Sequence, residues 1–335
     1  MTSPGRQRCI GCFSSALLAG IGRIMDEITL SPERRPLGKS HLSVSPMAWG
    51  MWRFAGDDVK AAHVRVEAAL AAGINFFDTA DIYGPDNDEP FGASEVLLGK
   101  VFAENPALRD RIVLASKGGI RMGVPYDSSP KYLREAVEAS LTRLGVEQID
   151  LWQIHRPDML AHPAETAGTL DAMVAEGKIG AVGVSNHTIA QTSALARYLR
   201  AGVVSTQPEF SPLATAPLFD GTLDRAMKHG MAVMAWSPLG QGRLGDGDPR
   251  PGRKVDEDAR IVATKAALQA QGQKYGVGVS AAAYSWIMAH PAGIIPIVGT
   301  QNPGRIADSA DAYKVRWTRA EWYGVLVASL GENLP

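Results

Sequence analysis

Short apolar runs alternate with longer stretches of helical periodicity from about residue 44 to the end of the chain. Most of these runs are continuously apolar, which is typical of parallel strands buried on both faces. We predict eight strands, near residues 44–49, 74–78, 112–117, 150–154, 180–184, 203–207, 232–236 and 294–298. Eight strand–helix units indicate an α/β fold, a single-domain (β/α)8 barrel over residues 25–335. A doubly wound open sheet is the alternative, but no GxGxxG motif follows an early strand.

Two of the helical stretches carry clear end signals. The first is expected to have Asp57 as its N-cap and to stop at Gly73. The second is expected to have Ser129 as its N-cap, Pro130 at its first helical position and Gly145 at its end.

The composition limits the class of protein. Charged residues make up 21% of 335 residues and the net charge is -1, which excludes a basic nucleic-acid-binding face. No run approaches the roughly 18 apolar residues of a membrane span. Cys9 and Cys12 alone provide no disulfide framework and no four-ligand zinc site. We therefore expect a cytoplasmic monomer or small homo-oligomer without metal, and a disordered leader over residues 1–24.

Polar residues follow the predicted strands at the point where each one ends. They are Asp78, Lys117, His155, Ser185, Asn186, Gln207, Trp236, Ser237, Gly299 and Thr300, and Tyr83 lies five residues beyond Asp78. Because the carboxyl ends of parallel strands meet at one face of a barrel, we expect these residues to converge there.

Tyr83, Lys117, Asp78 and His155 form a set that suits carbonyl reduction. A tyrosine hydroxyl has an unperturbed pKa of about 10, and a nearby ammonium lowers it toward neutral pH. A carboxylate beside the lysine keeps it charged and in place. Histidine supplies a hydrogen-bond donor for the substrate oxygen, so the set can protonate a carbonyl oxygen while a hydride reaches the carbon.

Four segments resemble the motifs of the aldo-keto reductases, in family order and at family-like spacing. They are the segments 73–84 (GINFFDTADIYG), 116–117 (SK), 154–157 (IHRP) and 183–186 (GVSN), and the resemblance covers about residues 28–330. It implies a barrel that binds a nicotinamide cofactor, NADP(H), without a Rossmann fold. It also implies that Tyr83 is the general acid, that Lys117 lowers its pKa, that Asp78 anchors Lys117 and that His155 orients the carbonyl.

The same resemblance implies a set of cofactor contacts. Ser185, Asn186 and Gln207 would hold the nicotinamide carboxamide, and Trp236 would lie under its ring. The remaining contacts would come from Gly50 and Met51, from the pyrophosphate loop with Ser237, Leu239, Gly240, Gly242 and Arg243, and from Gly299, Thr300, Arg305, Asp308 and Ser309. Many family members carry lysine at the position of Gly299, which leaves Arg305 as the main charged contact to the 2′-phosphate.

The substrate is a small-molecule aldehyde or ketone in this interpretation, and its pocket is assigned to Trp52, Phe54, Met122 and Trp152. Two alternatives stay open. A regulatory subunit could bind NADP and turn over slowly. A Schiff-base aldolase or isomerase would use Lys117 as nucleophile, but that amine would have to be neutral, which Asp78 opposes.

Overall fold

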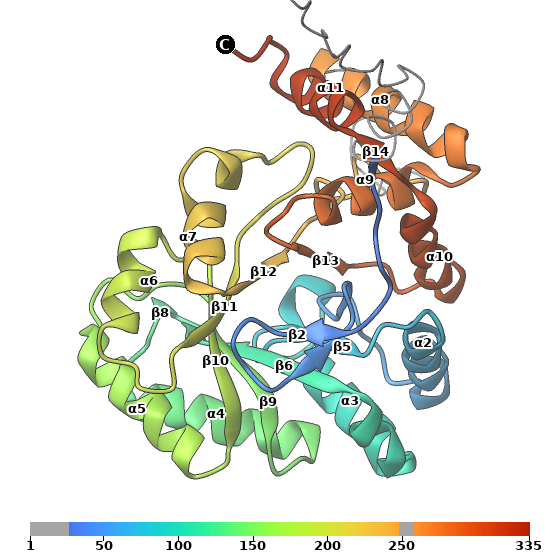
Figure 1. Ribbon diagram of the computed structural model, residues 1–335. Coiled ribbons are helices and arrows are strands. Elements are labelled where there is room, and N and C mark those ends of the chain that lie inside the picture. The colour runs from blue at the N-terminus through green and yellow to red at the C-terminus, as the bar shows by residue number, and fades with distance from the viewer. Residues whose placement is uncertain (1–26, 248–257) are drawn as a thin grey trace, which may run out of the picture.

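Eight parallel strands close into a barrel in the computed structural model, which describes residues 27–247 and 258–335 (Figure 1). Each strand pairs with the next along the chain, and the last pairs with the first through Ile297 and Ala48. The barrel strands are β4 (Ala48–Gly50), β5 (Phe76–Asp78), β6 (Val113–Gly118), β9 (Ile149–Ile154), β10 (Ile179–Ser185), β11 (Val203–Gln207), β12 (Ala232–Ala235) and β13 (Ile295–Val298). The predicted (β/α)8 barrel is confirmed, and the predicted leader lies outside the described residues.

Helices surround this barrel, and α8 and α11 pack against each other beyond the ring (Figure 1). The helices are α2 (Val59–Ala71), α3 (Ala93–Glu104), α4 (Pro130–Leu144), α5 (Pro163–Ala175), α6 (Ile189–Ala196), α7 (Thr222–His229), α8 (Ala259–Tyr275), α9 (Val279–Met288), α10 (Pro303–Asp308) and α11 (Arg319–Leu330). Within residues 27–247 and 258–335, no helix has the length and apolar character needed to cross a membrane.

The predicted helix ends are right for α4 and one residue off for α2. Ser129 caps α4, Pro130 is its first residue and Gly145 follows it in the left-handed conformation. In α2 the cap is Asp58 rather than Asp57, because the Asp58 carboxylate accepts a hydrogen bond from the Ala61 amide. Two adjacent aspartates give the same sequence signal, so the register of the first turn decides between them.

The first predicted strand, 44–49, is divided in two. Its start belongs to β3 (Ser43–Val44), which pairs antiparallel with β2 (Arg35–Pro36), whereas the barrel strand β4 begins at Ala48. Ser45 forms the break, because its amide donates to the Asn75 side chain and its hydroxyl donates to the Met47 carbonyl. Leu37, Leu42 and Val44 of this segment belong to the same buried cluster as Phe76 and Leu151 of the barrel.

Two shorter pairs complete the described sheets. β1 (Glu27–Ile28) pairs with β14 (Trp317–Thr318), and β7 (Ile120–Arg121) pairs with β8 (Val124–Tyr126) in the loop after β6.

The inward-facing residues change from apolar to polar toward the carboxyl ends of the strands. Phe76, Ala115 and Leu151 belong to one buried cluster inside the barrel. Side chains along a strand alternate between its two faces, so the residues two positions further on point the same way. These residues are Asp78, Lys117 and Gln153, all nearly inaccessible to solvent. The barrel therefore buries a polar layer directly above an apolar one.

Candidate active site

A buried ion pair between Lys117 and Asp78 forms the centre of this polar layer. The Lys117 Nζ lies 2.7 Å from Asp78 Oδ2 and also donates to the Thr79 carbonyl oxygen at 2.7 Å. Burial alone would lower the pKa of Lys117, but the charge of Asp78 and then Tyr83 raise it above its ordinary value. Lys117 is therefore a fixed cation at neutral pH.

The second oxygen of Asp78 is held by two glutamine side chains. Gln153 Nε2 donates to Asp78 Oδ1 at 3.1 Å and Gln207 Nε2 donates to the same atom at 3.0 Å. Gln207 Nε2 also donates to Gln153 Oε1 at 3.3 Å. The sequence interpretation missed Gln153. A polar residue two positions before His155, inside an apolar run, is the signal that could have identified it.

Tyr83 lies beside Lys117 because the turn after β5 is tied to β6. The amides of Thr79 and Asp81 donate to the carbonyl oxygens of Ala115 and Lys117, each at 2.9 Å. The ring centroid of Tyr83 is then 4.9 Å from Lys117 Nζ. This geometry brings the expected proton donor and the expected cation together.

The pKa of Tyr83 does not follow the expectation of an overall decrease. Burial raises the pKa of Tyr83, and the charge of Lys117, which acts in the opposite direction, does not cancel that effect. The direction expected for Lys117 is right, but desolvation of the phenolate is the larger effect in the resting protein. Tyr83 therefore keeps its proton at neutral pH.

His155 follows the last residue of β9 and faces Tyr83. Its amide donates to the Gly118 carbonyl oxygen at 2.8 Å, and the two rings lie edge to face with centroids 5.9 Å apart. Burial, followed by the charges of Lys117 and Arg156, holds the pKa of His155 well below its ordinary value. The imidazole is therefore neutral, so it can donate one N–H to a ligand oxygen.

The four residues expected around a nicotinamide are linked by hydrogen bonds. Trp236 Nε1 donates to Asn186 Oδ1 at 2.9 Å, and Asn186 Nδ2 donates to the Ser185 hydroxyl at 2.8 Å. The Ser185 hydroxyl donates to the Gln207 carbonyl oxygen at 3.0 Å. Through the Gln207 side chain this chain of contacts reaches Asp78. Asn186 Nδ2 also donates to the His155 carbonyl oxygen at 3.3 Å, so the network connects Trp236 with both His155 and the Lys117–Asp78 pair.

The expected pyrophosphate loop is a series of tight turns after β12. Ser237, Gly240 and Gly242 have positive φ values of 53°, 54° and 91°. The amides of Gly240, Gly242 and Arg243 donate to carbonyl oxygens within the loop, and Gly242 accepts the amide of Gly245. The amide of Leu244 donates to the Leu239 carbonyl oxygen in the same way. Several amides expected to face phosphate are therefore already used in shaping the loop.

The segment after β13 provides an open, positively charged corner. A Cβ atom added at Gly299 would meet nothing within 4 Å. Arg305 is exposed and makes no ion pair with any residue of 27–247 or 258–335. The Thr300 hydroxyl accepts the amide of Asn302 at 3.2 Å. These features fit an adenosine 2′-phosphate, which needs space and an uncompensated cation.

Asp308 and Ser309, expected near the adenine, differ in accessibility. Asp308 is exposed, whereas Ser309 is buried and its hydroxyl donates to the Ile306 carbonyl oxygen at 2.6 Å. The Ser309 side chain is therefore used inside the fold.

Gly50 ends β4, and Met51 follows it. The Met51 amide donates to the Asp78 carbonyl oxygen at 2.9 Å, and its side chain is buried in the core. Only main-chain atoms of Gly50 and Met51 lie beside Asp78.

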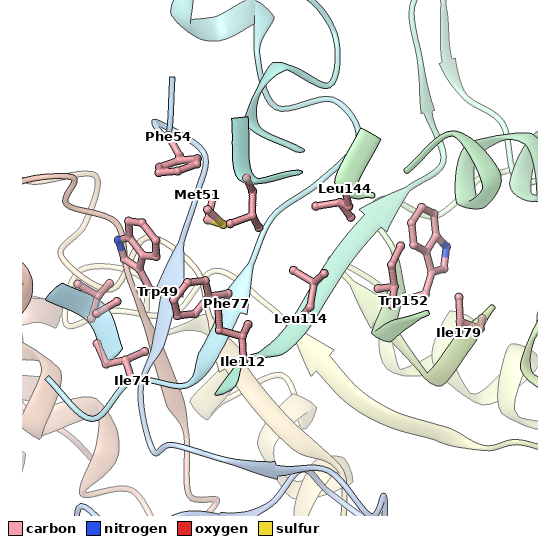
Figure 2. Packing of buried hydrophobic residues seen from close by; sticks show 14 of the residues in the cluster. Trp49, Met51, Phe54, Ile74, Phe77, Ile112, Leu114, Leu144, Trp152 and Ile179 are labelled. Carbon is pink, nitrogen blue, oxygen red and sulfur yellow. The ribbon is translucent and has the colours of Figure 1, made fainter. Parts of the chain in front are cut away.

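The expected substrate wall needs correction at two of its four residues. Phe54 and Trp152 are buried in the hydrophobic core (Figure 2), so their side chains do not line an open pocket. Trp152 precedes Gln153 on the strand and faces the opposite side of the sheet. Trp52 and Met122 are exposed, in the loops that follow β4 and β6.

A second buried charge cluster, which the sequence interpretation did not identify, lies behind the turn that carries Tyr83. Glu95 on α3 forms an ion pair with Arg143 on α4 at 2.7 Å and accepts a hydrogen bond from Ser116. Asp81 is buried nearby, and its two carboxyl oxygens have no hydrogen-bond partner among the described residues. Burial, followed by the charge of Glu95, raises the pKa of Asp81 well above its ordinary value.

The closed barrel with tyrosine, lysine, aspartate and histidine gathered at its carboxyl-terminal mouth defines a class of nicotinamide-dependent carbonyl reductases. The sequence matches the aldo/keto reductase family over residues 46–325. The chain belongs to this family.

Its relatives include proteins named for the reduction of aldehydes. A 6-dehydroglucose reductase of Novosphingobium aromaticivorans is 53% identical over 93% of this chain and 100% of its own length. A protein of the same name from Agrobacterium fabrum is 37% identical, over 88% of this chain and 97% of its own. The L-glyceraldehyde 3-phosphate reductase of Escherichia coli strain K12 is 28% identical, over 84% of this chain and 89% of its own. This chain is thus an oxidoreductase that acts on a carbonyl group.

Proposed function

We propose that the protein uses NADPH to reduce an aldehyde to an alcohol, with Tyr83 as the general acid. The observation that carries this proposal is the buried Lys117–Asp78 pair beside Tyr83, opposite a neutral His155. Bound NADPH would supply the hydride. Side chains of this chain would bind the carbonyl oxygen and supply the proton.

The protein's part in the reaction is to bind the carbonyl oxygen and protonate it. His155, as a neutral imidazole, donates one hydrogen bond to that oxygen. Tyr83, which keeps its proton in the resting site, transfers it as negative charge develops there. The fixed charge of Lys117 stabilises the phenolate that results, because the two groups lie in a water-poor environment.

The cofactor is placed by four side chains and one charged corner. Ser185, Asn186 and Gln207 would hold the carboxamide by exchanging some of the hydrogen bonds that they make with one another, and Trp236 would offer a flat apolar surface to the ring. Arg305, which has no acidic partner among the described residues, supports a preference for NADPH over NADH.

The first substrate to test is 6-dehydroglucose. Two relatives that this chain matches over nearly their whole length carry that substrate in their names.

The Schiff-base alternative is disfavoured by the state of Lys117. A nucleophilic amine must be neutral, whereas Asp78 and the Thr79 carbonyl oxygen stabilise the ammonium. A slow regulatory NADP sensor would share the same site and would differ in its turnover rate.

Replacement of Tyr83 by phenylalanine tests the proposal. The ring is kept and the proton is lost, so NADPH-dependent reduction of 6-dehydroglucose should fall about 10²- to 10⁴-fold. NADPH binding, followed by tryptophan fluorescence, should be retained. The matched control is Tyr198→Phe, at a half-exposed surface tyrosine, which should leave the rate unchanged. Retention of more than about a tenth of the rate by Tyr83→Phe would exclude Tyr83 as the proton donor.

A further inference from the structure

Arg156 is a cation of the active-site mouth to which the steps above give no task. It follows His155 directly, beyond the carboxyl end of β9. Its guanidinium carbon lies 5.9 Å from the ring centroid of Trp236, which follows β12 on the same face of the barrel. Its charge acts on both Tyr83 and His155. Arg156 is therefore close to both groups that would bind the carbonyl oxygen.

The guanidinium has no acidic partner in the described part of the chain. Two nearby carboxylates already have partners. Asp78 forms its ion pair with Lys117. Asp158 accepts the amides of Ser128 and Leu160, each at 2.8 Å. Among residues 27–247 and 258–335, no side chain or main-chain group forms a hydrogen bond or an ion pair with Arg156. Arg156 is half-buried, so its guanidinium donors can exchange water for the oxygen acceptors of a ligand.

The contact with Trp236 determines which part of the guanidinium remains available. An arginine that packs on an aromatic ring keeps its N–H groups free around its edge. Those donors form a planar fork, which suits two oxygen atoms on neighbouring carbons. An apolar aldehyde offers no such atoms, so Arg156 would distinguish oxygen-bearing aldehydes from apolar ones.

We propose that Arg156 determines substrate specificity by donating hydrogen bonds to oxygen substituents on the first two carbons beyond the reacting carbonyl. This inference rests on the proposed function and names the substrate class of that same site, aldehydes with adjacent hydroxyl or ether oxygens. In this proposal Arg156 contacts the substrate and takes no part in the proton transfer.

A pair of three-carbon aldehydes tests the inference. Glyceraldehyde carries one hydroxyl on each of the two carbons that follow its carbonyl carbon, and propanal carries none. Arg156→Met should raise the KM for glyceraldehyde about 10- to 100-fold, the effect of losing hydrogen bonds from a charged donor. For propanal, kcat/KM should change less than about threefold. Each variant is compared with wild type on the same aldehyde, so differences in aldehyde hydration cancel. Arg156→Lys keeps the charge but lacks the planar fork of donors. Its KM for glyceraldehyde should therefore lie between those of wild type and Arg156→Met.

The matched control is Arg53→Met. Arg53 also packs on a tryptophan in a loop of the same face, 5.1 Å from the ring centroid of Trp52, and it is exposed. Arg53→Met should leave kcat/KM unchanged for both aldehydes. Equal losses of kcat/KM for glyceraldehyde and propanal in Arg156→Met would overturn the inference, because Arg156 would then act on Tyr83 or His155. If wild type reduces neither aldehyde with NADPH, the proposed function itself fails.

Discussion

Replacement of Lys117 by methionine would leave the Asp78 carboxylate buried without its cation. Lys117 is fully buried and its Nζ donates at 2.7 Å both to Asp78 Oδ2 and to the Thr79 carbonyl oxygen. Removing one partner of a buried ion pair costs about 3–5 kcal/mol in the free energy of unfolding. Methionine fills most of the volume, so little of this loss comes from a cavity. We expect Lys117→Met to lose stability in that range and to lose its reductase activity.

The double variant Asp78→Asn/Lys117→Met separates the effect of charge from the effect of packing. Asparagine keeps an oxygen that can accept the hydrogen bonds of Gln153 and Gln207, but it carries no charge. The double variant should therefore be more stable than Lys117→Met alone, even though it carries a second substitution. Urea unfolding followed by far-UV circular dichroism measures both differences. A loss below about 1 kcal/mol in Lys117→Met, or a double variant with the summed loss of the two single variants, would refute this reasoning.

Three further substitutions test the cofactor corner and the second charge cluster. Arg305→Ala should weaken NADPH binding about 10- to 150-fold, as expected for a lost charge-assisted hydrogen bond, and should barely affect NADH binding. Equal losses of affinity for the two cofactors would show that Arg305 does not bind the 2′-phosphate. Gly299→Lys should strengthen NADPH binding about tenfold, since the backbone leaves room for a Cβ there and the added ammonium can reach the 2′-phosphate. Unchanged affinity would contradict the assignment of this corner. The pKa of Asp81 is raised by burial and by Glu95, so ionisation of Asp81 opposes folding once the pH exceeds the unfolded pKa of about 3.9. In urea unfolding, the stability of Asp81→Asn relative to wild type should therefore increase as the pH rises from 4.5 to 8. A relative stability that decreases with pH would show that ionisation of Asp81 favours folding instead.

The sequence predicts the strands well because each barrel strand is a compact apolar run between helical stretches. The run 44–49 is the exception. Ser45 and Pro46 interrupt its apolar residues, and the strand breaks there between β3 and β4. The Ser45 hydroxyl bonds locally to the Met47 carbonyl oxygen, whereas the bond from the Ser45 amide to Asn75 is tertiary. The Ser45-Pro46 pair is the sequence signal that could have divided this strand.

The two misplaced pocket residues have a different cause. Aromatic character indicates burial or contact with a ligand equally well, so Trp152 was assigned to the pocket. Strand alternation places Gln153 with Lys117 and Asp78, inside the barrel, and Trp152 on the other side. Residue type predicted the chemistry of the site, whereas period-two counting along β9 decides which side chains reach it.

The pKa of Tyr83 was beyond prediction from sequence for a physical reason. Its direction depends on whether desolvation or the charge of Lys117 is larger, and that balance is a property of the folded packing.

The most direct test of the central claim is to follow deuterium from NADPH labelled at C4 of the nicotinamide into the alcohol product. If the ring lies against Trp236 with one face toward Tyr83 and His155, only one of the two C4 epimers should transfer its label. That epimer should give alcohol with one deuterium on the former carbonyl carbon, and the other should give unlabelled alcohol, as read by mass spectrometry. Unlabelled alcohol from both epimers would contradict hydride transfer from the nicotinamide.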